Sequence, residues 1–122
     1  MESILESIKK LLGIPEEQKH FDVDIVMHIN SVFSVLTQLG VGPSEGFSIE
    51  DDLAVWNDFI KDDSKLQLVK SYMHHKVKLL FDPPLNSAVL GSIERTIAEF
   101  EWRLNVAAES SRTNSEEIQN GK

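Results

Sequence analysis

Residues 65–106 read KLQLVKSYMHHKVKLLFDPPLNSAVLGSIERTIAEFEWRLNV, and the rest of the chain is expected to pack around this stretch. In its first half, apolar residues recur every three or four positions, as on one face of a helix: Leu66, Val69, Met73, Val77 and Leu80. Pro83 disfavours helical backbone angles at Asp82, and Pro84 follows directly, so the first helix must end there. The sequence therefore predicts a helical hairpin that turns at Asp82-Pro83-Pro84.

The second arm of this hairpin begins at Asn86 or Ser87, because either side chain can cap a helix. Its apolar residues again follow the helical period: Leu90, Ile93, Ile97, Phe100, Leu104 and Ala107. Trp102 lies off this stripe, close to Ala98 and Val106. Two interpretations stay open. Trp102 packs on a second face inside the monomer, or it contacts another chain, since aromatic residues anchor many interfaces.

Three shorter helices are predicted before the hairpin, over residues 3–12, from residue 22 or 24 to 39, and over about residues 52–60. In the third helix, Leu53, Trp56 and Ile60 are expected to face the core. Residues 46–50 are expected to form a loop or a short strand. The predicted fold class is therefore all-α, a small bundle of about five helices that ends in the long hairpin.

The composition changes at Glu109. Residues 109–122 contain a single large aliphatic residue, Ile118, so this segment cannot bury enough apolar surface to order itself. We therefore expect a helical domain over residues 1–108 and a flexible C-terminal tail over residues 109–122.

The overall composition restricts the classes of function. Of the 122 residues, 41% are hydrophobic and 26% charged, which is ordinary for a globular domain, and no apolar run approaches the ~20 residues that span a bilayer. The net charge of −8 opposes binding to nucleic acid through its phosphates. Cysteine is absent, which excludes disulfides, thiolate metal sites and cysteine nucleophiles and fits a reducing compartment.

The sequence offers no pattern for catalysis or for a bound cofactor. The four histidines, at positions 20, 28, 74 and 75, form no pair at the four-residue spacing that zinc sites on helices use. Acidic residues cluster at 50–52 and 62–63, where carboxylates at helix starts are favoured by the helix dipole. We therefore expect no catalytic residues, no metal and no cofactor, and we expect that the protein is not an enzyme.

The hairpin resembles the head–tail connector, or adaptor, family of tailed bacteriophages. The segments that carry the resemblance are VKSY at 69–72, KVKLLFDPP at 76–84 and EFEWRLN at 99–105, together with LGVGP at 39–43 and WNDF at 56–59. The resemblance implies a structural protein of the virion head–tail junction that is made in the host cytoplasm. It implies a homo-oligomeric ring of about a dozen copies, docked between the portal protein and a tail-side neck or stopper protein. Double-stranded DNA would pass through the ring without sequence-specific binding, and no membrane is involved.

Six residues are candidates for protein–protein contacts in such an assembly: Trp56, Phe59, Trp102, Arg103, Arg112 and Ile118. For Trp56 and Phe59, packing in the core is the favoured alternative, because large aromatic residues are mostly buried. The end of the last helix or the tail is expected to engage the portal. The main alternative to a connector is a small acidic helical regulator that binds a basic partner protein, and a helical enzyme or metalloprotein is a third.

Overall fold

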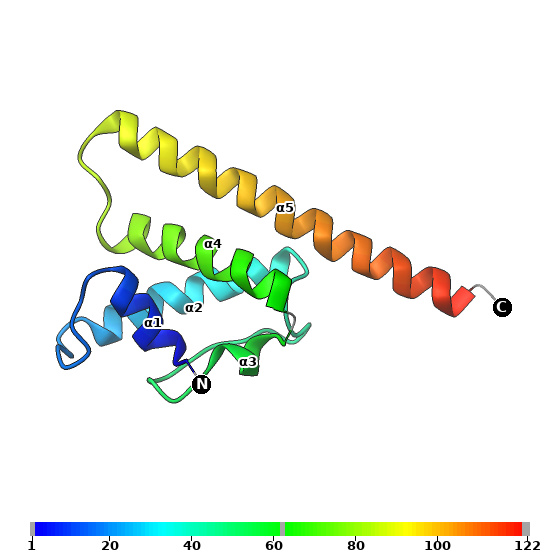
Figure 1. Cartoon of the computed structure of the whole chain (residues 1–122), viewed down its shortest axis with the longest axis horizontal. Helices are drawn as coiled ribbons and strands as arrows, with labels where there is room; N and C mark the ends of the chain where they lie inside the picture. Colours follow the sequence, from blue (N-terminus) through cyan, green and yellow to red (C-terminus); the bar gives the residue numbers. More distant parts are fainter. Residues whose placement is uncertain (1, 62, 121–122) are drawn as a thin grey trace.

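The computed structural model describes residues 2–61 and 63–120, except for the side chains of residues 63 and 111–120. Within this part the fold consists of helices and loops: α1 (Ile4–Leu11), α2 (Asp22–Gln38), α3 (Trp56–Phe59), α4 (Asp63–Phe81) and α5 (Ser87–Asn120). Figure 1 shows α4 lying between α5 on one side and the three shorter helices on the other. The expected all-α bundle with a C-terminal hairpin is confirmed.

Local sequence signals explain where the first two helices begin and end. The Ser3 hydroxyl accepts a hydrogen bond from the backbone amide of Glu6 at 3.2 Å, which caps α1. Gly13 then takes a positive φ of 79°, which a residue with a side chain rarely adopts. At α2 no side chain caps the start, but Asp22 and Asp24 stand in the first turn, where they suit the helix dipole.

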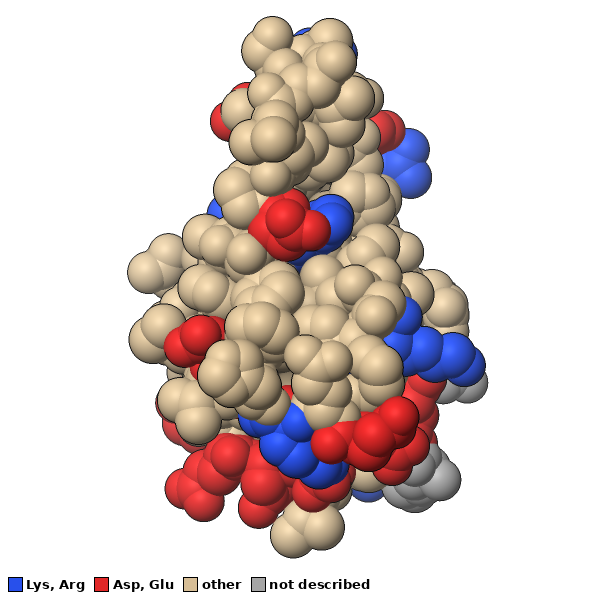
Figure 2. All heavy atoms as spheres, turned by 90° about the vertical axis from the view of Figure 1, so that its left-hand side faces the viewer, with Lys and Arg blue, Asp and Glu red and all other residues tan. Residues whose placement is uncertain are grey.

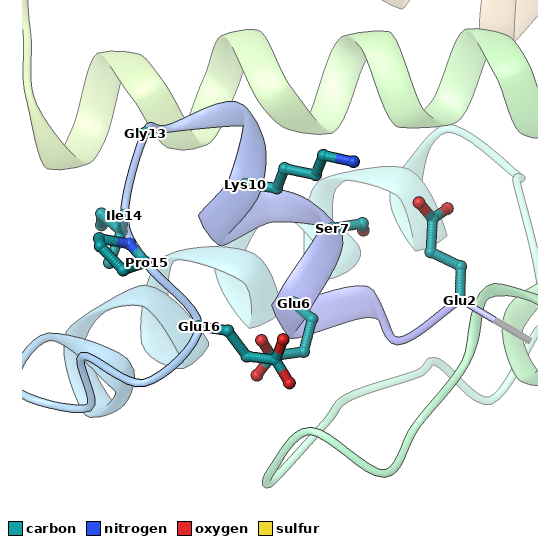
Figure 3. A pocket seen from close by; sticks show the side chains of 8 residues that line it. All are labelled: Glu2, Glu6, Ser7, Lys10, Gly13, Ile14, Pro15 and Glu16. Atoms are coloured by element: carbon teal, nitrogen blue, oxygen red, sulfur yellow. The ribbon is translucent and has the colours of Figure 1, made fainter.

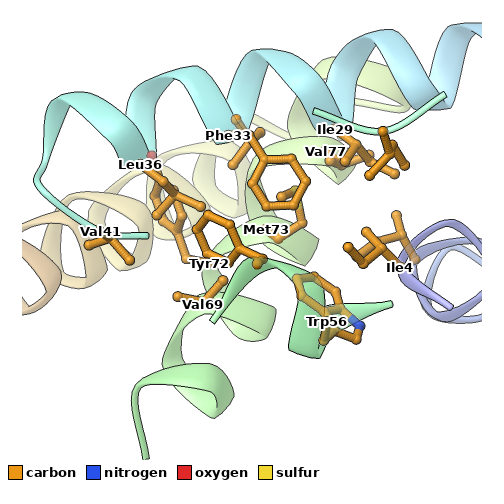
Figure 4. Packing of buried hydrophobic residues seen from close by; sticks show 14 of the residues in the cluster. Ile4, Ile29, Phe33, Leu36, Val41, Trp56, Val69, Tyr72, Met73 and Val77 are labelled. Atoms are coloured by element: carbon orange, nitrogen blue, oxygen red, sulfur yellow. The ribbon is translucent and has the colours of Figure 1, made fainter. Parts of the chain in front are cut away.

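The core lies between α1, α2 and α4. Figure 4 shows Phe33 of α2 facing Tyr72 and Met73 of α4, with Trp56 of α3 closing one side. The ring of Phe33 lies 4.7 Å from that of Phe59, centroid to centroid, so α3 is anchored through aromatic contacts. Four residues of the predicted α4 stripe are buried in this core, Leu66, Val69, Met73 and Val77, and Tyr72 beside them is buried as well. The fifth residue of the stripe, Leu80, is about half exposed, because it lies at the end of α4 next to the hairpin turn.

The loop between α2 and α3 differs from one expectation. The third helix begins at Trp56 and not near residue 52, and Leu53 is 79% exposed and not in the core. Two hydrogen bonds explain the difference: the carboxylate of Asp51 accepts one from the backbone amide of Leu53 at 2.9 Å, and the carbonyl of Ala54 accepts one from the backbone amide of Ile4 at 3.0 Å. These bonds hold the chain in a turn and a short extended stretch. Residues 46–50 are a loop without a named strand in the described structure.

The last helix is longer than the sequence predicts. The composition change at Glu109 is not a helix end, because α5 continues to Asn120. Its last buried described side chain is Ala108, and Figure 1 shows the rest of α5 running beyond α4 and away from the body. The flexibility of residues 109–122 stays a prediction.

Candidate protein-interaction surface

Helix α5 is covered on one side only. Its main contacts are with α4, and the buried side chains among those described on this helix are Ile97, Leu104 and Ala108. Near its middle, α5 also approaches the turn that follows α2, where Gly40 lies against the side chain of Ala108. Up to residue 110, the opposite face of the helix is open to solvent.

The open face carries an apolar line. Ala98, Trp102 and Val106 are spaced by four residues and therefore lie one above the other, while Trp102 lies about 160° around the helix from Leu104. Trp102 is 67% exposed and Val106 38%. We call Ala98, Trp102 and Val106 the outer stripe. An exposed tryptophan in such a line is a feature of protein interfaces.

Charged side chains border the outer stripe. Arg103 donates a hydrogen bond to Glu99 at 2.7 Å, and more than half of each side chain is exposed. An exposed pair of this kind adds little to the stability of the monomer. The outer stripe therefore has an apolar centre with a polar border, which is how protein interfaces are built.

A polar contact fixes how α5 is rotated on α4. The buried hydroxyl of Tyr72 donates a hydrogen bond to the Glu101 carboxylate at 2.7 Å, and Lys76 lies 3.8 Å from the same carboxylate. Burial raises the pKa of Tyr72 well above its usual value, and the hydrogen bond to Glu101 raises it further. Tyr72 therefore stays a donor. Neighbouring residues of a helix point about 100° apart. The bond that holds Glu101 toward α4 therefore keeps Trp102, and with it the outer stripe, on the open side of α5.

The turn of the hairpin forms a second apolar surface. Leu85 is fully exposed, and Leu80 and Val89 on either side are each about half exposed. The Asn86 side chain caps α5 by accepting hydrogen bonds from the amides of Ala88 and Val89, at 2.8 and 3.2 Å. Figure 2 shows that uncharged side chains cover this upper end, whereas Asp and Glu gather at the opposite end.

A comparison with known protein families agrees with these features. The family model described as phage connector protein matches residues 4–111, which is most of the chain. The chain belongs to the phage connector protein family. It is thus a structural component of the bacteriophage particle, a head–tail connector that assembles with other phage structural proteins. No curated protein and no solved structure gives a significant match to it.

The six candidate residues lie in three different environments. Trp56 and Phe59 are 3% and 4% exposed, so they pack in the core, which was the favoured expectation for both. Trp102 and Arg103 are exposed on the open side of α5. Arg112 and Ile118 belong to the end of α5, and their side chains lie outside the described residues. A contact role for any of them stays a prediction.

Sequence reasoning missed the exposed leucine at the hairpin turn. Leu85 follows two prolines and precedes the capping Asn86, and neither signal says whether its side chain is covered. Its place in a tight turn, between two helix ends that pack together, was the available hint.

No cofactor or metal site emerges among the side chains that the structure describes. No group of three or more His, Asp or Glu residues among them could hold a metal ion. His74 and His75 are neighbours on α4 with their rings 5.5 Å apart, and the ring of His75 contacts Phe100 of α5. In the described residues, no helix is long and apolar enough to cross a bilayer. Membership of a structural family points to a role without catalysis.

Proposed function

We propose that this connector forms a closed ring between the portal protein and a tail-side neck protein, at the head–tail junction of the virion. The ring contains about a dozen copies, as closed cyclic symmetry allows. Double-stranded DNA passes through its centre. The protein acts by docking and involves no covalent chemistry.

The observation that carries this proposal is the uncovered side of α5. A helix that the body covers on one side only, with Trp102 and Val106 open to solvent, is suited to contacts with neighbouring chains. The connector family supplies the class of those neighbours, which are other structural proteins of the phage.

The charge of the chain supports a conduit for DNA. At −8, each copy repels phosphate, so a ring of many copies would not hold the duplex as it slides past. A single domain of 122 residues is too small to enclose a duplex, so a conduit requires several copies.

The end of α5 is the proposed portal contact. Beyond Ala108 the helix leaves the body, and it carries Arg112 and Ile118. A chain that ends after Ala108 keeps every buried residue of the described core. We expect this shortened chain to fold normally and to lose most of its affinity for the portal. Unchanged affinity would remove the end of α5 from the proposal.

The direct experiment mixes the purified chain with the portal protein of the same phage. Size-exclusion chromatography with light scattering, followed by electron microscopy, measures whether a ring sits on the portal. We expect a single complex with closed symmetry and a central channel. Two proteins that migrate separately at micromolar concentrations would contradict the proposal. The chain alone is no test, because a connector can stay monomeric until it meets its portal.

A further inference from the structure

Helix α1 separates two surfaces of opposite charge. A groove of about 370 Å³ lies between α1 and α4, and Ser7, Lys10 and Leu11 line it from α1. A second depression, of about 420 Å³, is lined by Leu5 of α1 and by residues 50–52. Leu5 and Ser7 point about 200° apart on the helix, so the two surfaces lie on opposite sides of α1.

The groove between α1 and α4 is basic in an acidic protein. Its basic residues are Lys10 and Lys70, and Glu2 is its only acidic residue. Lys70 is paired with Glu2 at 2.9 Å. Among the side chains that the structure describes, Lys10 has no ion-pair partner. Figure 3 shows Lys10 and Glu2 on the side of α1 that faces α4, where they also line a neighbouring pocket together with Glu6 and Glu16.

The groove also has an apolar part. Leu11, at its edge, is half exposed. A ligand that fits this groove therefore carries negative charge and one aliphatic side chain.

The loop on the other side of α1 has that composition. Glu50, Asp51 and Asp52 are exposed, and Leu53 beside them is 79% exposed. No other described loop combines three successive acidic residues with an exposed aliphatic residue. We call residues 50–53 the acidic loop.

The acidic loop is held at both ends. The side chain of Asn30 bonds to both backbone groups of Ile49, at 2.8 and 2.9 Å. At the other end, Ala54 accepts the hydrogen bond from Ile4. A loop fixed in this way loses little conformational entropy when it binds, so it is prepared for docking.

We infer that the acidic loop of one copy binds the groove between α1 and α4 of the next copy. Its carboxylates then face Lys10, and Leu53 contacts Leu11. Because the loop and the groove lie on opposite sides of α1, the contact joins two different surfaces, and such contacts build rings. The inference rests on the proposed ring and identifies the contact between its neighbours.

The test uses the absence of cysteine in the natural chain. Asp52→Cys is combined with Ser71→Cys, since Ser71 is an exposed residue of α4 that lines the groove. The double variant is mixed with the portal protein of the same phage, oxidised mildly and run on a denaturing gel. We expect a ladder of covalent oligomers, because each copy links to two neighbours, whereas either single variant yields at most dimers.

A matched control distinguishes this contact from others. Asp52→Cys with Ser92→Cys places the second thiol on an exposed serine of α5 instead of α4. We expect no ladder from this pair. Rings on the portal without a ladder from the Ser71 pair, or a ladder from the Ser92 pair instead, would overturn the inference and leave the proposed function standing. If no ring forms on the portal, both the inference and the proposed function fail.

A charge exchange provides a second measurement that needs no introduced cysteine. Lys10→Glu should weaken ring formation on the portal at least about tenfold, because the acidic loop would then meet a like charge. Adding Asp52→Lys to the same chain should restore much of the loss. Lys61→Glu, which makes the same change of charge elsewhere, should have little effect. Equal loss in Lys61→Glu and Lys10→Glu, or no restoration by Asp52→Lys, would contradict the contact.

Discussion

Helices α4 and α5 carry similar apolar patterns in the sequence, but they have different surroundings in the fold. Helix α4 contacts α1, α2 and α5, and four of its residues are fully buried: Val69, Tyr72, Met73 and Val77. Helix α5 has nearly twice as many residues, yet among its described side chains only Ile97, Leu104 and Ala108 are buried. We conclude that α4 holds the monomer together, whereas α5 leaves one face uncovered, which we propose serves other chains.

The largest expected effect is on the α4 side of this comparison. Met73→Ala removes a fully buried side chain from the centre of the core and should lower the free energy of unfolding by about 2–5 kcal/mol. Val89→Ala, at a half-exposed position of α5, should cost less than about 1 kcal/mol. Urea denaturation followed by circular dichroism measures both. Similar losses at the two positions would mean that α5 is as enclosed as α4.

A smaller effect is expected where the two helices are joined. Tyr72→Phe removes the hydrogen bond to Glu101 and should lower the free energy of unfolding by about 1.5–3 kcal/mol, because the acceptor is charged. Arg103→Gln breaks only an exposed pair and should change it by less than about 0.5 kcal/mol. Equal effects of these two variants, in the same denaturation assay, would show that the buried bond does not fix α5 on α4.

The sequence predicts the helices of the hairpin well, but it predicts poorly which of their faces are buried and which are exposed. The proline turn at 82–84 and the stripe through Val69, Met73 and Val77 are local signals, so the hairpin and its core side follow from them. The placement of Leu53 depends on a hydrogen bond to Asp51 and on the pairing of Ala54 with Ile4, and the second of these contacts joins distant parts of the chain. The exposure of Trp102 depends on how α5 is rotated, and a contact between helices sets that rotation. Family resemblance was needed to identify the connector.

A pH effect is expected at the groove between α1 and α4. Burial lowers the pKa of His74 below its usual 6.5, and the neighbouring His75 lowers it further, against a hydrogen bond to the backbone of Leu11. Below pH 6.5 the unfolded chain then takes up the proton more readily than the folded chain, so the stability should fall as the pH drops.

The melting temperature measured at about pH 7.5 and pH 5.5 checks this sign. The decrease should be smaller in His74→Gln than in the natural chain. His20→Gln, at an exposed position, serves as the control and should keep the full decrease. An unchanged decrease in His74→Gln would assign the effect to other groups.

Two aromatic residues, two positions apart on α5, distinguish its two faces. Phe100 packs against the core, whereas Trp102 is exposed. Phe100→Ala should destabilise the monomer, and Trp102→Ala should leave its free energy of unfolding within about 0.5 kcal/mol of the natural value. The measurement is the affinity of the folded Trp102→Ala protein for the portal, with ring formation scored by electron microscopy. We predict a loss of at least about tenfold. Unchanged assembly by Trp102→Ala, or a loss of monomer stability as large as that of Phe100→Ala, would contradict the claim that the open face of α5 serves other chains.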